Sequence, residues 1–179
     1  MGTVFKLNAH GTLTILYSFT GPDGNQPVAA LVEDRNGNFY GTTASGGVDN
    51  QGTIFRIDSS GVLASLHKFS TADGAHPQGA HTLASDGNLH GTTADGGASG
   101  FGTLFKLDST GTLTTIHSFA QLEDGGDPYA PPVEASDGYL YGTTPYGGRP
   151  SSVGVIYRIK CDFCIQPRCT RCPREVSFR

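Results

Sequence analysis

The segment from Tyr40 to Leu63, YGTTASGGVDNQGTIFRIDSSGVL, occurs in two further copies along the chain. It returns as HGTTADGGASGFGTLFKLDSTGTL from residue 90 and, in shortened form, as YGTTPYGGRPSSVGVIYRI from residue 141. Successive copies are offset by about 50 residues, a period typical of propellers and other repeat arrays. This repeat constrains the fold more than any other feature of the sequence.

Each repeat divides at its turn residues into four short segments. In the second unit they are PVAALVED, NFYGTTAS, GTIFRID and VLASLHKF, and apolar residues alternate in the third segment as in a half-buried strand. Asn-Gly or Asp-Gly pairs join the first two segments of each unit, at 36–37, 86–87 and 137–138, and predict hairpins with type I′ turns. Four antiparallel strands per repeat predict an all-β β-propeller with about three blades per chain.

The repeats start and stop within a blade. Residues 2–19 match a third and a fourth strand, two whole blades follow, and residues 128–159 match a first, second and third strand. The two ends are therefore expected to share one blade. Because propellers usually have about four to eight blades, we expect a homodimer that completes a six-bladed ring. An open fragment, the alternative, would leave strand edges exposed.

Composition limits the partners and the location. Residues 1–160 form the expected propeller domain, whereas 161–179 form a Cys- and Arg-rich tail that we expect to be irregular. The formal net charge of −4 argues against nucleic acid, which requires clustered Lys and Arg. No apolar run is long enough for a membrane span, and no secretion signal precedes the repeats. We expect a cytoplasmic protein as encoded, or a piece of an exported one.

The motifs LVEDRNGNFYGTTASGG, GTIFRIDSSG, LHKF and DGAHP resemble the GloVer tandem repeat of bacteria. The resemblance covers residues 1–160 and implies a β-propeller, but the family is not tied to one activity. Chains built from such repeats include a Ca²⁺-dependent hydrolase that opens N-acyl-homoserine lactones. The resemblance therefore implies a quorum-quenching lactonase that acts on a small-molecule lactone and uses Ca²⁺.

Carboxylates recur in the loops that connect one blade to the next. These residues are Asp23, Asp73, Asp124 and Asp127. Carboxylates on glycine-rich loops suit Ca²⁺, which takes six to eight oxygen ligands in flexible geometry. The alternative is that each Asp only closes its own Asp-Gly turn by accepting hydrogen bonds from the backbone.

Two histidines depart from the repeat consensus. His76 stands where the preceding repeat has Gln26, and His81 stands where it has Leu31. A polar residue in place of an apolar one on the innermost strand suggests a side chain that lines the channel. A neutral histidine there is a candidate general base toward water. Repeat drift is the alternative interpretation.

Three aromatic side chains on loops are candidates for binding the acyl chain of a lactone: Phe101, Tyr129 and Tyr146. A rival interpretation is a non-enzymatic module in which Tyr129, Tyr146, Thr42, Thr43 and their repeats contact a glycan. Repetition of the same loop favours this rival, because catalysis needs one asymmetric site. A third interpretation is a fragment with no function of its own.

The tail contains Cys161, Cys164, Cys169 and Cys172. Two C-x2-C pairs can offer four thiolates to tetrahedral Zn²⁺. The linker of four residues between the pairs is short for that purpose. Disulfides or a loosely structured end are the alternatives.

Overall fold

The computed structural model describes residues 1–122, 124–148, 153–160 and 176–178. These residues form β-strands joined by turns and loops, and they include no helix that could cross a membrane. The strands fall into four antiparallel sheets, which we call the first to fourth blades in chain order. The first blade consists of β1 (Thr3–Leu7) and β2 (Leu13–Ser18).

The other three blades have four strands each. The second blade consists of β3 (Val32–Glu33), β4 (Phe39–Thr43), β5 (Thr53–Ile57) and β6 (Leu63–Lys68). The third consists of β7 (Thr82–Leu83), β8 (Leu89–Thr93), β9 (Thr103–Leu107) and β10 (Leu113–Ser118). The fourth consists of β11 (Val133–Glu134), β12 (Tyr139–Thr144), β13 (Val155–Lys160) and β14 (Val176–Phe178).

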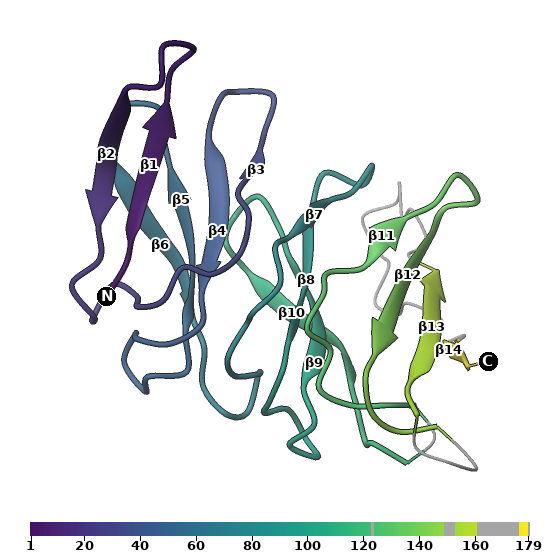
Figure 1. Cartoon of the computed structure of the whole chain (residues 1–179). Helices are drawn as coiled ribbons and strands as arrows, with labels where there is room; N and C mark the ends of the chain where they lie inside the picture. Colours follow the sequence, from purple (N-terminus) through teal and green to yellow (C-terminus); the bar gives the residue numbers. More distant parts are fainter. Residues whose placement is uncertain (123, 149–152, 161–175, 179) are drawn as a thin grey trace.

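The blades stand side by side in an open arc, with the N-terminus at one end and the C-terminus at the other (Figure 1). The prediction that both ends share a blade is wrong. Strand β14 pairs with β13 and supplies the fourth strand of the last blade from the tail, while β1 pairs with β2. Within the tail, which we expected to be irregular, residues 176–178 therefore form a strand.

The hairpins between the first two strands of each blade are confirmed, but their turn type differs from the prediction. In the turn from Asp34 to Asn38, Gly37 has a φ of 77° whereas Asn36 has no positive φ. The Asp34 carboxylate instead accepts hydrogen bonds from the backbone N–H groups of Asn36 and Asn38, at 2.8 and 2.9 Å. The backbone closes a wider turn than type I′, because the Asp34 N–H donates to the Asn38 carbonyl at 2.9 Å and the Gly37 N–H donates to the Asp34 carbonyl at 3.1 Å, so only one residue needs the left-handed region.

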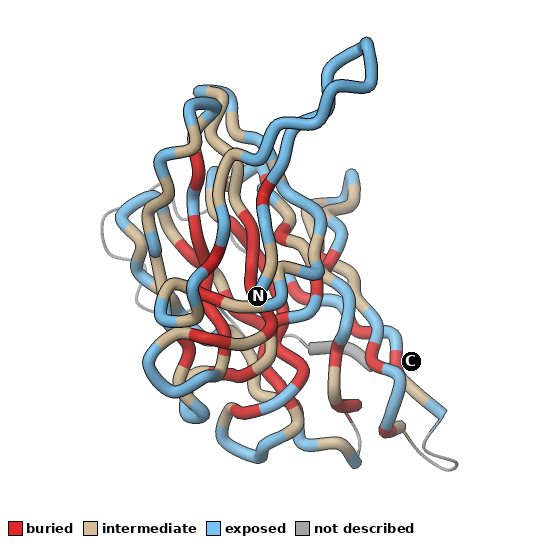
Figure 2. Tube along the Cα trace, turned by 60° about the vertical axis from the view of Figure 1, so that its left-hand side comes forward, coloured by how far each residue is buried: buried red, intermediate tan, exposed pale blue. Residues whose placement is uncertain are grey.

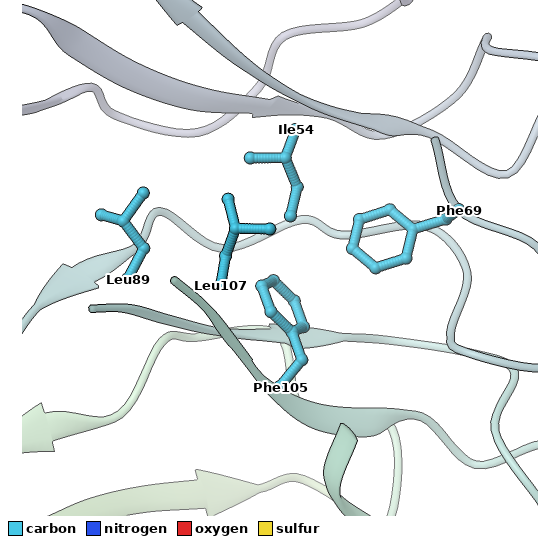
Figure 3. Packing of buried hydrophobic residues seen from close by; sticks show 5 residues of the cluster. All are labelled: Ile54, Phe69, Leu89, Phe105 and Leu107. Carbon is cyan, nitrogen blue, oxygen red and sulfur yellow. The ribbon is translucent and has the colours of Figure 1, made fainter. Parts of the chain in front are cut away.

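Apolar side chains pack between neighbouring blades, and buried residues run through the middle of the arc (Figure 2). Between the second and third blades, Ile54 lies near Phe69, Leu89, Phe105 and Leu107 (Figure 3). The rings of Phe69 and Phe105 meet edge to face, with centroids 5.3 Å apart. Because the same positions recur in each repeat, similar clusters form at the other two junctions.

The GTT threonines of the second and third blades are buried and form hydrogen bonds within and between blades. Thr42 and Thr43 are 1% and 0% exposed. The Thr42 hydroxyl donates to the Gly79 carbonyl of the next blade at 3.2 Å, and the Thr43 hydroxyl lies 2.9 Å from that of Thr53. The rival interpretation placed these threonines on a glycan-binding surface, which is wrong because both are buried and bonded within the fold.

Candidate active site

The loops that connect successive blades meet the loops between the second and third strands of each blade. Isolated β-bridges join them at Asn25 and Ser45, at Ala75 and Asp95, and at Gly126 and Tyr146. We call this end of the blades the loop face. Each bridge brings together two positions whose residue differs from repeat to repeat. One lies directly before a proline, and the other is the second residue after the GTT motif.

The residue before each proline has an uncommon backbone conformation. The φ angles of Gln26, His76 and Asp127 are 58°, 51° and 54°. A non-glycine residue with positive φ persists only where surrounding structure holds it. The backbone N–H of His76 donates to the Gln51 carbonyl of the preceding blade, and that of Asp127 donates to the Phe101 carbonyl, both at 2.9 Å. Neighbouring blades therefore fix both residues.

In the third blade the side chains at the two variable positions are hydrogen-bonded to each other. His76 Nδ1 lies 2.9 Å from Asp95 Oδ2, and the side chains are 41% and 55% exposed. A carboxylate that accepts from one ring nitrogen orients the imidazole and leaves the other nitrogen available for proton transfer. The pair thus has the geometry of a general base with an orienting group, and it is open to solvent.

Two of the other predicted residues lie within electrostatic reach of Asp95. Burial raises the pKa of Asp127, and the negative charge of Asp95 raises it further. Burial also raises the pKa of Tyr129, with smaller contributions from Tyr146, Asp127 and Asp95. Tyr129 and Tyr146 are 46% and 47% exposed. The loop face therefore brings Asp127 and Tyr129 near Asp95, and Tyr146 near Tyr129.

Sequence reasoning missed Asp95, although a signal for it was present. Asp95 occupies the position of Ser45 and Tyr146 in the GTT loops, so it is a variable residue of the repeat in the same way as His76. In the second blade the equivalent pair is Gln26 with Ser45, whose Oγ lies 3.4 Å from the Gln26 side-chain oxygen. One scaffold therefore carries a different pair in each blade, which supplies the asymmetry that catalysis requires.

Phe101 contacts the site through its backbone, and its side chain packs against the core. Its carbonyl accepts from the Asp127 N–H, and its half-buried ring packs against the cluster of Leu104, Phe119, Tyr157 and Ile159. Phe101 therefore lies next to Asp127 but is tied to the junction of the third and fourth blades.

The aspartates of the blade connections each serve their own turn. Asp73 Oδ1 accepts from Ser70 N and Oγ at 2.8 and 3.1 Å, and its Oδ2 lies 2.9 Å from His67 Nε2. Asp124 accepts from Ala120 N and lies 2.8 Å from His117 Nε2. His67 and His117 stand at equivalent positions of successive repeats.

Asp23 has the same arrangement in the first connection. It accepts from Thr20 N at 2.8 Å and from the Tyr17 hydroxyl at 2.6 Å. The three aspartates lie at three different blade junctions, and the described residues contain no group of three or more His, Cys, Asp or Glu side chains arranged to hold a metal ion. This donor set does not fit a shared Ca²⁺ site. The turn-closing alternative accounts for all three carboxylates.

His81 lies apart from the exposed pair. Its side chain is 4% exposed, and neither ring nitrogen has a hydrogen-bond partner. The ring packs edge to face on Phe105 at 5.7 Å and approaches Gly91, where an added Cβ would lie 2.7 Å from His81 Nδ1. Burial lowers the pKa of His81 to about 4, so the ring is neutral near pH 7. Its catalytic role stays a prediction, and in this structure the ring is shielded from solvent.

A groove lies at the opposite end of the blades from the His76–Asp95 pair. This groove of about 920 Å³ between the second and third blades is lined partly by Arg35, Arg56, Leu89, Asp108 and Glu134. None of the predicted site residues lines it. The four tail cysteines, with the predicted zinc site, lie outside the described residues.

The fold and the site together define a β-propeller-type repeat protein with an exposed His-Asp pair on its loop face. The chain belongs to the Gloeobacter/Verrucomicrobia repeat family, whose profile matches residues 1–163. Comparison with curated protein sequences gives no significant match.

Solved propeller-like structures share the fold. The chain is similar to selenomethionine-substituted virginiamycin B lyase from Staphylococcus aureus, with 18% identity and a TM-score of 0.57 over 88% of this chain and 45% of the lyase. It is also similar to a putative 6-phosphogluconolactonase from Bacteroides uniformis, with 21% identity and a TM-score of 0.55 over 89% of this chain and 46% of that one. The chain thus spans less than half the length of these structures.

Proposed function

We propose that this protein is a propeller hydrolase that opens lactone or related ester bonds on its loop face. The observation that carries the proposal is the 2.9 Å contact between His76 Nδ1 and Asp95 Oδ2 in a solvent-accessible position. The resemblance to repeat chains that include a lactonase suggests N-acyl-homoserine lactones as the first substrates to test. The similar lyase and lactonase-type structures support the fold in which such a site would sit.

In the proposed mechanism, the neutral His76 ring keeps its Nδ1–H, which donates a hydrogen bond to the Asp95 carboxylate, and Nε2 acts as the general base. Water loses a proton to Nε2 and attacks the lactone carbonyl. The ring C–O bond then breaks, and the departing alkoxide takes the proton from the imidazolium. The products are a hydroxy acid and a neutral histidine, so atoms and charge balance.

In this mechanism Tyr129 donates a hydrogen bond to the carbonyl oxygen as negative charge develops there. The pKa of Tyr129 is raised from its ordinary value near 10, so the phenol is protonated at neutral pH like an ordinary tyrosine. Tyr146 offers a second exposed ring on the same face for the acyl chain. Because the carboxylates do not fit a shared Ca²⁺ site, no step is assigned to the ion.

The test is hydrolysis of N-acyl-homoserine lactones and simple lactones by purified protein, followed by mass spectrometry. His76→Gln is expected to lower kcat by about 10²- to 10⁴-fold, the usual contribution of a general base. His10→Gln, at an exposed turn of the first blade, is the matched control and should retain turnover. Unchanged turnover in His76→Gln would contradict the mechanism. Absence of turnover with every lactone would contradict the hydrolase proposal.

The second candidate is a non-enzymatic binding module, favoured by the groove between the second and third blades. Its wall combines Arg35 and Arg56 with the carboxylates of Asp34, Asp108 and Glu134 and with apolar Leu89, so it offers both donors and acceptors to the hydroxyl groups of a glycan. Binding of oligosaccharides that is lost in Arg56→Ala, with Arg158→Ala as the control, would support this function. Turnover that depends on His76, without such binding, would exclude it.

A further inference from the structure

Equivalent positions in the four blades differ in burial according to whether another blade covers them. On the face turned toward the preceding blade, Phe55 and Phe105 are both 0% exposed. The equivalent Phe5 of the first blade is 55% exposed. Leu7 is 63% exposed, whereas its counterparts Ile57 and Leu107 are 0% and 1% exposed. The first blade therefore presents a face that the same repeat buries elsewhere.

Strand β2 extends this uncovered face. Phe5 pairs with Ile15 and Leu7 with Leu13 across the two strands. Ile15 and Leu13 are 57% and 54% exposed, so four large apolar side chains lie together on one side of a two-stranded sheet. Contiguous apolar patches of this kind mark interaction surfaces. We call Phe5, Leu7, Leu13 and Ile15 the rear face.

The fourth blade is uncovered on its other side. Ile54 and Leu104, which face the following blade, are each 0% exposed, whereas the equivalent Ile156 is 61% exposed. We call the side of the fourth blade that carries Ile156 the front face. The two faces lie at opposite ends of the arc, so one copy cannot bring them together (Figure 1).

The internal junctions indicate what covers such faces. Phe55 packs against Val4 and Phe19 of the preceding unit, and Phe105 packs against Ile54 and Phe69. In each case a residue equivalent to Ile156 meets a residue equivalent to Phe5. The chain also matches only 45% and 46% of the similar propeller chains, so two copies supply about as much structure as one of those.

We propose that the rear face docks on the front face of a second copy of this chain, and that two such contacts close a ring with two-fold symmetry. This inference is independent of the proposed function. With four sheets per copy the ring has eight blade positions, in place of the six expected from the sequence. Two of those positions hold the two-stranded first blade.

Light scattering of the purified chain tests the proposal, with the mass of a dimer as the expected result. Phe5→Asp and Ile156→Glu each place a charge in both contacts and should give monomers with an unchanged circular dichroism spectrum. Val62→Asp, at a turn residue that is 67% exposed in the second blade, is the control and should remain dimeric.

Mixing the variants distinguishes head-to-tail docking from other dimers. A Phe5→Asp copy and an Ile156→Glu copy together contain one contact with two native faces, so a mixed dimer should form although each variant alone is monomeric. A dimer that survives Ile156→Glu would show rear-to-rear docking and overturn the proposal. A monomeric parent chain, or a mass that grows steadily with concentration, would overturn the closed ring.

Discussion

His76 Nδ1 and Asp95 Oδ2 lie 2.9 Å apart although 19 residues separate them in the chain. The β-bridge between Ala75 and Asp95 produces this contact by tying the blade connection to the loop after the GTT motif. Because both residues occupy variable positions of a repeated scaffold, substitutions there can change chemistry without changing the fold.

Asp95→Asn should alter the titration of its neighbours. Loss of the negative charge is expected to lower the pKa of Asp127 and of Tyr129, since Asp95 raises both in the parent protein. NMR titration of labelled tyrosine, with Tyr129→Phe to assign the signal, measures the effect. Asp49→Asn removes an exposed carboxylate from the second blade and should leave the Tyr129 titration unchanged. An unshifted Tyr129 in Asp95→Asn would contradict the proposed cluster.

His81→Leu should remove a sensitivity to acid. Burial lowers the pKa of His81 to about 4, so between about pH 6.5 and pH 4 the unfolded chain binds a proton that the folded chain does not. This difference costs the parent protein up to about 3 kcal/mol of stability as the pH falls through that window. The gap in Tm between His81→Leu and the parent should therefore widen from pH 7 to pH 4.

The matched control for His81 is Leu31→His, at the equivalent position of the second blade. Leu31 is 38% exposed, so a histidine there would stay hydrated and should add little acid sensitivity. Turnover of His81→Leu separately tests the predicted catalytic role. Retained turnover would assign His81 to packing alone.

Asp73→Ala should destabilise the protein by about 2 kcal/mol, because the carboxylate accepts hydrogen bonds from Ser70 and contacts His67. Chemical denaturation measures the loss, and Asp49→Ala should be close to neutral. Because Asp73 serves its own turn, calcium or a chelator should not change the Tm of the parent protein. A calcium-dependent rise in Tm that disappears in Asp73→Ala would restore the predicted ion site.

Asp127→Asn should stabilise the protein at neutral pH. The pKa of Asp127 is raised in the folded state, so the folded chain holds a proton that the unfolded chain has lost, and stability falls as the pH rises through this interval. Asparagine removes that cost. The gain in Tm should be present at pH 7 and absent at pH values below the ordinary pKa of aspartate. An equal gain at both pH values would indicate a cause other than titration.

Much of the fold could be predicted because it repeats. The strand TIFRI matches β5, and its counterparts match β9 and β13, since alternating apolar residues specify a β-strand. The type I′ turns were wrong because backbone hydrogen bonds close a wider loop in all three hairpins, with only Gly37, Gly87 and Gly138 at positive φ. The Asn-Gly and Asp-Gly pairs alone do not show the length of the loop. The strand at residues 176–178 was missed because the tail carries no repeat motif.

The candidate residues His76, Asp127, Tyr129 and Tyr146 lie on loops that the structure brings to one face. Their roles in catalysis or binding stay predictions. His81 and His76 both depart from the repeat consensus, so the sequence did not distinguish them. In the structure His76 is exposed and His81 is buried. The repeat pattern cannot show which of the two histidines is buried, because burial depends on whether the next blade covers the position.

By itself, the sequence determined the strand order, the blade repeat and the family. The repeat period, the turn residues and the apolar alternation are local properties that recur in each repeat. Only the tertiary structure decided which variable residues meet. Asp95 pairs with His76 through a bridge between two loops, the turn aspartates stay within their own blades, and Phe5 and Ile156 lack the cover that their counterparts have. Each of these outcomes depends on contacts between segments far apart in the chain, and no local pattern encodes them.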